Sequence, residues 1–370
     1  MRRLIGFLVV LGAITAMPSA APSWVSPRAA DGHPDLTGIW ENISATPLER
    51  PAQFADKPLL SDAELADLQD RALRLAAPDQ DAVFGDGFYN ALLASQKAAS
   101  DGAAPKRFGA YGANWMPGRL VERRTSLITD PADGRLPPFT EAYMSARDAA
   151  LAVRPRFLRG PEDASVTDRC VSYGVPDLFA AYMSLYRITQ SRDTVVINME
   201  KIHDARIVPL DGRPHISPKI RHYLGDPRGR WEGDTLVVES TNFHPAGNPM
   251  GGLIRLSDQN LTLTERFTRT GPDTIKYEFT VDDPTVWTRR WSAMVPWTRA
   301  RGQIYEYACT EGNYSLRNML SAARFEESHP LAASSSHRSD ARGVCGGQFI
   351  RRTPRAAFNE RYGGTSESAY

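Results

Sequence analysis

The C-terminal half of the chain predicts a mainly β fold (α+β overall), an antiparallel β-barrel with N-terminal helices and long loops. In residues 226–243 a tight turn, the indole of Trp231 and an acidic glycine turn at 232–234 lead into an apolar strand. The same order of strand and turn recurs in residues 261–267 and 274–281. Hairpins at intervals of about ten residues favour a barrel or sandwich over βαβ units.

Apolar residues with a period of two continue through this half of the chain, which indicates successive strands. We expect these strands over residues 187–190, 194–200, 205–210, 218–224, 234–240, 252–257, 261–269, 274–281, 286–294 and 303–309. A helix over residues 318–327 is expected to follow them.

The first residues have the pattern of a secretory signal peptide. Arg2 and Arg3 precede an apolar stretch that is too short to span a bilayer and is followed by small residues. We therefore expect a signal peptide over residues 1–21 and a periplasmic or secreted protein, with a membrane anchor as the less favoured alternative. Its removal takes the formal net charge from +1 to −1, which indicates neither nucleic acid nor an anionic membrane as a partner.

After a linker over residues 22–33, we expect one barrel-type domain over residues 34–327 and a partly disordered tail over 328–370. Within the domain, residues 34–165 form a mixed helical and loop part, and the strands lie in 166–327. Ser61 and Glu64 form a capping box that predicts a helix over 61–75, and further helices are expected over 88–99 and 140–153. A short strand is expected over 124–130.

Three cysteines are present, at positions 170, 309 and 345. In an oxidising compartment one pair is expected, with one thiol left over. We expect a disulfide between Cys170 and Cys309, since both adjoin predicted strands while Cys345 lies in the Gly-rich tail. The spacing fits no zinc motif.

Polar residues that could carry chemistry are densest between 200 and 215, on turns that a barrel would gather at one end. There His203 or His215 would transfer a proton, and Arg206 or Arg213 would hold developing negative charge, with Asp211 to orient them. The alternative is a salt-bridge network that only braces the loops.

The substrate is expected to contact polar and aromatic side chains that face the lumen or overhang the barrel mouth. These are Trp231, Tyr223, Asn242, His244, Tyr277 and Trp287. For the tryptophans, packing in a core is the commoner role.

No cofactor is expected. The seven histidines form neither His-x-His nor His-Glu-x-x-His, and a metal site built in space from His203, His215 and His244 stays open. The chain has no Gly-x-Ser-x-Gly nucleophile elbow, no phosphate loop and no dinucleotide-binding glycine motif.

Several segments together resemble a family of uncharacterised secreted bacterial proteins. The matching segments are 34–40, 124–135, 202–206, Asp-Gly-Arg-Pro-His at 211–215, Arg-Gly-Arg-Trp-Glu-Gly-Asp-Thr-Leu-Val-Val at 228–238, Thr-Asn-Phe at 241–243 and Glu-Tyr-Ala-Cys at 306–309. The resemblance covers about residues 34–327 and implies export and a β-rich fold, but no mechanism. Where that family carries a histidine after the cysteine of the Glu-Tyr-Ala-Cys motif, this chain has Thr310.

A weaker likeness, in Gly38-x-Trp40 and the serial hairpins, is to lipocalin-like barrels. It implies that Trp40 plugs one end of the barrel. Such barrels bind small apolar molecules, and some isomerise, hydrate or cyclise them without a cofactor.

These observations predict an exported, cofactor-independent enzyme of the lyase, isomerase or hydratase type. Its substrate would be a small apolar or carbohydrate-derived molecule in a barrel pocket. The first alternative is a non-catalytic periplasmic carrier of a small molecule, and the second is a structural protein of the envelope.

Overall fold

In the computed structural model, the described residues are 24–75, 86–101, 119–152, 158–176, 178, 184–245, 248–250, 254–256 and 260–329. The expected signal peptide, most of the expected tail and Cys345 lie outside them. Within them, no helix is long and apolar enough to cross a membrane.

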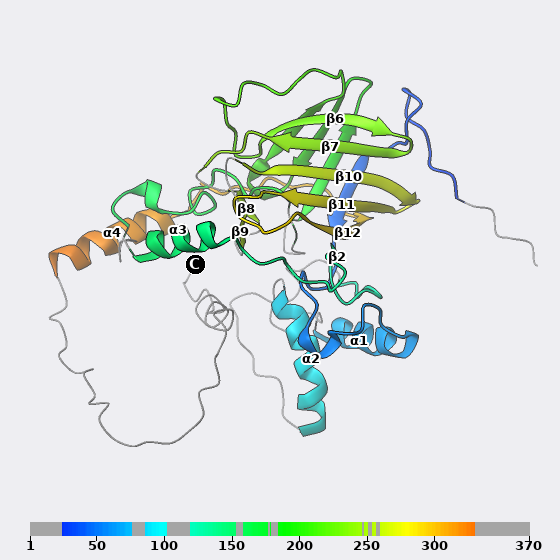
Figure 1. Ribbon diagram of the computed structural model, residues 1–370, viewed down its shortest axis with the longest axis horizontal. Helices are drawn as coiled ribbons and strands as arrows, with labels where there is room; N and C mark the ends of the chain where they lie inside the picture. The colour runs from blue at the N-terminus through cyan, green and yellow to red at the C-terminus, as the bar shows by residue number, and fades with distance from the viewer. Residues whose placement is uncertain are drawn as a thin grey trace, which may run out of the picture.

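A ten-stranded antiparallel sheet curls into a nearly closed barrel (Figure 1). Nine strands follow the order β5-β4-β3-β1-β12-β11-β10-β7-β6, and β2 pairs with β12 outside this order. The strands are β1 (Gly38–Asn42), β2 (Ile128–Asp130), β3 (Leu185–Gln190), β4 (Thr194–Met199), β5 (Ala205–Pro209), β6 (Asp226–Glu232), β7 (Thr235–Thr241), β10 (Thr262–Gly271), β11 (Thr274–Asp282) and β12 (Trp291–Arg299). A separate hairpin contains β8 (Asn248–Met250) and β9 (Ile254–Leu256). The predicted mainly β fold with an antiparallel barrel is confirmed.

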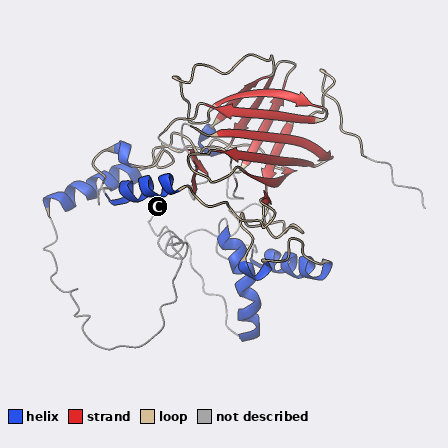
Figure 2. Ribbon diagram, in the orientation of Figure 1, coloured by secondary structure: helices blue, strands red, loops and turns tan. Residues whose placement is uncertain are grey.

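The helices lie outside the barrel, as Figure 2 shows. They are α1 (Asp62–Leu75), α2 (Asp86–Asp101), α3 (Glu141–Ala152) and α4 (Ser315–Ser328), with short 3-10 turns η1 (Ala52–Phe54), η3 (Pro161–Asp163) and η4 (Lys201–His203). The capping box forms, because the Glu64 carboxylate accepts the Ser61 N–H at 2.9 Å and Ser61 Oγ accepts the Glu64 N–H at 3.3 Å. The helices expected from the sequence are all present with shifted ends.

Glycine closes the barrel where its first and last strands meet. A Cβ on Gly229 of β6 would lie 2.5 Å from Leu210 Cδ2 and 2.7 Å from Val208 Cγ1, the latter on β5. Only a residue without a side chain therefore lets β6 come this close to β5. The two strands meet through side-chain packing, because they are the two ends of the hydrogen-bonded order.

Alternate residues of the strands fill the barrel interior. Phe267, Ile275 and Trp291 are 0 % exposed, Phe279 is 1 % exposed and Trp297 is 3 % exposed. Trp297 stacks between Tyr186 at 4.2 Å and Tyr277 at 4.7 Å, measured between ring centroids. Along the described strands the interior is thus a packed core rather than an open lumen.

Trp40 seals the interior beside β3 and β12, the two neighbours of β1. Its side chain is 0 % exposed, and its Nε1–H donates to the Leu36 carbonyl at 2.9 Å. The Arg299 guanidinium lies 4.5 Å from the ring centroid, a cation–π contact. The positive φ of 146° at Gly38 turns the chain into this position.

Four segments differ from the expectation. Residues 226–232 form β6 rather than a turn, and residues 218–224 are a loop with only a single bridge, from His222 to Phe243. β12 starts at Trp291 rather than near 286, because the Asp283 carboxylate accepts the Thr285 N–H at 2.9 Å and holds a turn. Residues 303–309 make no ladder, since their amides donate to side chains instead.

Candidate functional site

Two groups of charged side chains could carry chemistry, one inside the barrel and one on its outer face. Inside, Arg206 of β5 is 3 % exposed and Glu265 of β10 is 1 % exposed. The guanidinium Nη1 donates to Glu265 Oε1 at 2.9 Å, and Nη2 donates to Glu265 Oε2 and, at 3.1 Å, to Ser240 Oγ. Tyr277 donates its hydroxyl to Glu265 Oε1 at 2.7 Å.

This interior group holds its charges in fixed roles. Burial by itself lowers the pKa of Arg206, but the Glu265 carboxylate reverses this and raises the pKa above its usual value. The guanidinium therefore stays charged, and both of its Nη atoms donate to one carboxylate. An arginine so bound is not available to neutralise charge on a substrate, so Arg206 acts as part of the core.

The outer-face group, here called the His215 cluster, consists of His215, Asp226, Arg228 and Glu239. Asp226 and Arg228 lie on β6, Glu239 lies opposite Arg228 on β7, and His215 comes from the loop between β5 and β6. Gly229 packs against Val208 of β5. Because side chains alternate along a strand, Asp226 and Arg228 project to a different face from Gly229, on the outside of the barrel. The geometry therefore places an imidazole against two carboxylates and a guanidinium.

The imidazole of His215 is held through Nδ1. Nδ1 lies 2.9 Å from Asp226 Oδ2, and Nε2 lies 3.5 Å from Glu239 Oε1. The side chains of His215 and Glu239 are 27 % and 43 % exposed, whereas Asp226 is 8 % exposed. A buried carboxylate that fixes the ring and a second one open to solvent make a path for a proton.

Asp226 is an ionised anchor. Burial raises the pKa of its carboxyl, but the Ile216 N–H, the His215 ring and the Arg228 guanidinium together hold the pKa below its usual value. Ile216 N–H donates to Oδ2 at 3.0 Å and Arg228 Nη1 donates to Oδ1 at 2.6 Å. Because Asp226 is ionised, it can only accept from His215, so the proton sits on Nδ1 and Nε2 faces Glu239.

The loop that carries His215 is fixed to the ends of β6 and β7. Asn242 Nδ2 donates to the carbonyls of Ile216 at 3.0 Å and Ser217 at 3.3 Å, and Arg228 Nε donates to the Pro214 carbonyl at 3.0 Å. Asn242 takes a φ of 58°, a left-handed conformation that asparagine tolerates better than most residues. The expected contact residue Asn242 thus positions the His215 loop.

Of the other expected catalytic residues, Asp211 and Arg213 form an exposed ion pair with each other. Arg213 lowers the pKa of Asp211 to about 2. His203 is exposed at the end of η4, where its Nε2 accepts the Tyr307 N–H at 3.0 Å. His215 instead contacts Asp226 and Glu239, so the structure divides the expected polar group among separate places.

The expected substrate-contacting residues are likewise spread over the molecule. Tyr223 packs on His244, with ring centroids 4.6 Å apart, and neither residue lies in a strand. Trp231 stacks on His33 at 4.7 Å, which places a residue of the expected linker against the barrel. Tyr277 lies in the barrel core, and Trp287, which is 2 % exposed, packs on Phe139 at 4.4 Å.

The expected disulfide is present: Cys170 and Cys309 are joined, across 139 residues of sequence. Among the described residues there is no group of three or more histidine, cysteine, aspartate or glutamate side chains that could hold a metal ion. The three histidines at 203, 215 and 244 do not converge within that part of the chain.

The sequence did not single out Asp226, Arg228, Glu239 or Glu265 as site residues. The sequence favours a turn role for Asp226 and Arg228 over a catalytic one. The alternation of charges at 226, 228 and 230, with a period of two, is the signal of a strand with one polar face.

Comparison with protein-family models, with curated proteins and with solved structures finds no match to this chain. The nearly closed antiparallel barrel is compatible with the lipocalin-like architecture, and it is a likeness of architecture alone.

Proposed function

We propose that this protein is an exported, cofactor-independent enzyme of the lyase type that acts on a carbohydrate-derived molecule, with the His215 cluster as its acid–base site. The observation that carries the proposal is the imidazole held between a buried and an open carboxylate, 2.9 Å and 3.5 Å from its two nitrogens. The Cys170–Cys309 disulfide supports export, because structural disulfides persist in oxidising compartments.

The openness of the cluster favours a saccharide over a small apolar molecule. An apolar ligand gains its affinity from enclosure, and the barrel interior that would enclose it is filled by side chains. An extended, hydrated sugar chain can lie along an exposed face and bind through hydrogen bonds. The His215 cluster presents donors and acceptors of this kind on the outside of β6 and β7.

The chemistry that fits these groups is β-elimination on an acidic sugar. The Nε2 of His215 removes the proton on the carbon next to the sugar carboxylate. The electron pair forms a carbon–carbon double bond as the neighbouring glycosidic C–O bond breaks. The leaving oxygen takes from His215 Nε2 the proton that the ring removed, which restores the site.

The test uses two uronate polymers, alginate and polygalacturonate, as probes. Elimination creates a conjugated double bond, and so the ultraviolet absorbance of the solution rises. Replacement of His215 by Gln removes the proton-transfer group and is expected to lower the initial rate by about 100-fold or more. His222→Gln is the matched control, because His222 is an exposed histidine of the same loop outside the cluster.

Two results would overturn the enzyme proposal: no elimination product from either polymer, or equal rates for the wild type and His215→Gln. A carrier, the alternative from the sequence, would migrate more slowly in electrophoresis through a gel that contains alginate or polygalacturonate, and it would form no product. That outcome assigns binding without catalysis.

A further inference from the structure

Tyr277 lies where the charged group of the barrel interior meets a row of aromatic rings. Its hydroxyl donates to Glu265 Oε1 at 2.7 Å, and its ring centroid lies 4.7 Å from that of Trp297. The side chains of Tyr277 and Trp297 are 2 % and 3 % exposed, and Glu265 is 1 % exposed. The phenol and its carboxylate partner are therefore enclosed by the core, and neither belongs to the His215 cluster.

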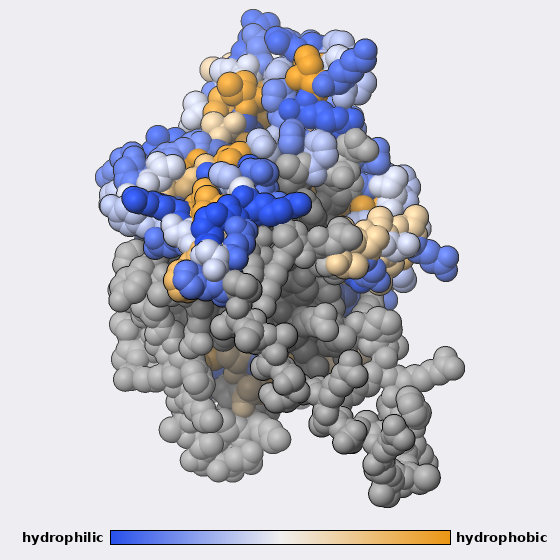
Figure 3. Space-filling view, turned by 90° about the vertical axis from the view of Figure 1, so that its left-hand side faces the viewer, coloured by the Kyte–Doolittle hydropathy of each residue, from blue (hydrophilic) through white to orange (hydrophobic). Residues whose placement is uncertain are grey.

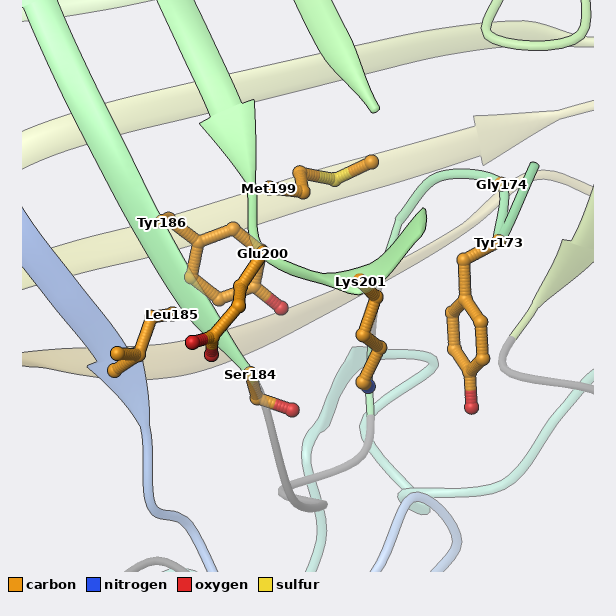
Figure 4. Close-up of a pocket in the computed structure, with 8 residues that line it drawn as sticks. All are labelled: Tyr173, Gly174, Ser184, Leu185, Tyr186, Met199, Glu200 and Lys201. Carbon is orange, nitrogen blue, oxygen red and sulfur yellow. The ribbon is translucent and has the colours of Figure 1, made fainter. Parts of the chain in front are cut away.

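The row of rings continues from Trp297 to the end of the barrel. Trp297 stacks on Tyr186 of β3, with ring centroids 4.2 Å apart and ring planes 7° apart. Tyr186 lies opposite Met199 of β4 at this end, as Figure 4 shows. On its other side Tyr186 is paired with Trp40 of β1, and facing residues of neighbouring strands have Cβ atoms about 5 Å apart.

The row reaches the surface at Trp24, which is 39 % exposed. The Arg269 guanidinium lies 5.7 Å from the ring centroid of Trp24 and 5.7 Å from that of Trp40. An electron can therefore leave the interior in short steps from ring to ring, without any opening of the barrel.

Three tryptophans of the core hold their indole N–H groups without a hydrogen-bond partner. Within the described residues this is true of the buried Nε1 atoms of Trp287, Trp291 and Trp297. Buried polar groups without a partner are rare and call for an explanation. An indole that loses an electron becomes a strong acid, but it keeps its proton where no acceptor is in reach. Such a ring remains a strong oxidant and takes an electron from a neighbouring ring.

Tyr277 has the proton acceptor that these indoles lack. A phenol gives up an electron far more easily when a base takes its proton at the same time. Glu265 Oε1 is that base, and the Arg206 guanidinium holds it as a carboxylate by donating to both of its oxygens. Electron transfer through packed rings needs no contact with solvent, so full burial is compatible with this role.

We propose that Tyr277 is a one-electron redox site, which a one-electron oxidant at the surface oxidises through Tyr186 and Trp297. The oxidant gains the electron that Tyr277 loses, and the phenol proton moves to Glu265 Oε1. The products are a neutral phenoxyl radical on Tyr277 and a neutral carboxylic acid on Glu265.

The proton stays beside the ring that released it. A one-electron reductant, such as a thiolate, returns the electron through the same rings, and Glu265 gives the proton back to the phenoxyl oxygen. The site therefore holds one oxidising equivalent inside the barrel and releases it again with no change in covalent structure.

The test forms a one-electron oxidant in solution, the ruthenium(III) tris(bipyridine) that a light flash produces from ruthenium(II) in the presence of a cobalt(III) quencher. Electron paramagnetic resonance is recorded on samples frozen after the radicals on surface tyrosines have decayed. The wild type is expected to keep a tyrosyl signal, because a radical enclosed in the core cannot couple to a second molecule. Tyr277→Phe keeps the ring and removes the phenol, and it is expected to lose most of this signal.

Tyr223→Phe is the matched control, because Tyr223 stacks on His244 outside the row, and it should keep the full signal. Trp297→Phe places a ring that is hard to oxidise in the row, and it is expected to lower the signal several-fold. Melting temperatures check that each variant is folded. A wild type without a persistent tyrosyl signal, or a signal of full size in Tyr277→Phe, would overturn the proposal. A full signal in folded Trp297→Phe would overturn the row as its route.

Discussion

The interior and the outer face of the barrel both carry paired acidic and basic side chains, but these pairs have different roles. Inside, Arg206 meets Glu265 at full burial, and Tyr277 donates its hydroxyl to the same carboxylate. Outside, His215 meets Asp226 and Glu239 while it keeps 27 % of its side chain exposed. The difference teaches that burial, more than residue type, separates a group that specifies the fold from a group that can do chemistry.

The surface at the end of the barrel that bears α3 and α4 agrees with this division. In Figure 3 hydrophilic residues dominate the described part of that face, and hydrophobic residues lie among them in separate patches.

Breaking the interior pair is expected to have the largest effect on stability. Glu265→Ala leaves the Arg206 guanidinium buried without its carboxylate, which should lower the free energy of unfolding by about 3–5 kcal/mol. Urea unfolding followed by tryptophan fluorescence measures it. The Arg206→Met/Glu265→Leu pair is the control, since it removes both charges and should recover most of the loss; a loss below about 1 kcal/mol for the single change would contradict the structural role.

Removing the anchor of the outer cluster should have an intermediate effect. Asp226→Asn loses the charge that binds Arg228 and orients His215, at a cost of about 1–3 kcal/mol. The folded pKa of Asp226 is lowered, so its contribution is fully present above the unfolded value of 3.8 and is lost as the pH falls through the folded pKa. The free energy of unfolding, measured by urea titration, should therefore fall less between pH 7 and about pH 3 in the variant than in the wild type. An equal fall in both proteins would refute this role.

The exposed ion pair should have the smallest effect. Arg213→Ala removes the partner that lowers the pKa of Asp211 to about 2, yet both groups are solvated in either state. The melting temperature at neutral pH is expected to stay unchanged. Carboxyl NMR should show the pKa of Asp211 move back up towards its usual value, and a clear drop in melting temperature would place this pair among the structural contacts.

The sequence predicted the elements that depend on local pattern. The capping box at Ser61 and the hairpin of β10 and β11 follow from residues close together in the chain. The antiparallel pair β3 and β4 follows from the alternation of apolar residues in two neighbouring segments. The pairing of Cys170 with Cys309 was also predicted, because only two of the cysteines adjoin strands.

What the sequence could not show depends on how the barrel closes. Arg206 and Glu265 come from β5 and β10, which are not neighbours in the sheet order, so their contact crosses the interior. His215 reaches Asp226 only because Asn242 and Arg228 fold the intervening loop back on β6. The period of two identified which residues share a face, but not which side chains meet across it.

Gly229 sets where this barrel is weakest. Every other neighbouring pair along the sheet order is joined by a ladder of backbone bonds, whereas β5 and β6 touch only through the side chains that the missing Cβ admits. Separating β5 from β6 would expose packed side chains but would break no ladder of backbone hydrogen bonds. The barrel therefore closes between β5 and β6 by packing, and the loop that bears His215 connects these two strands.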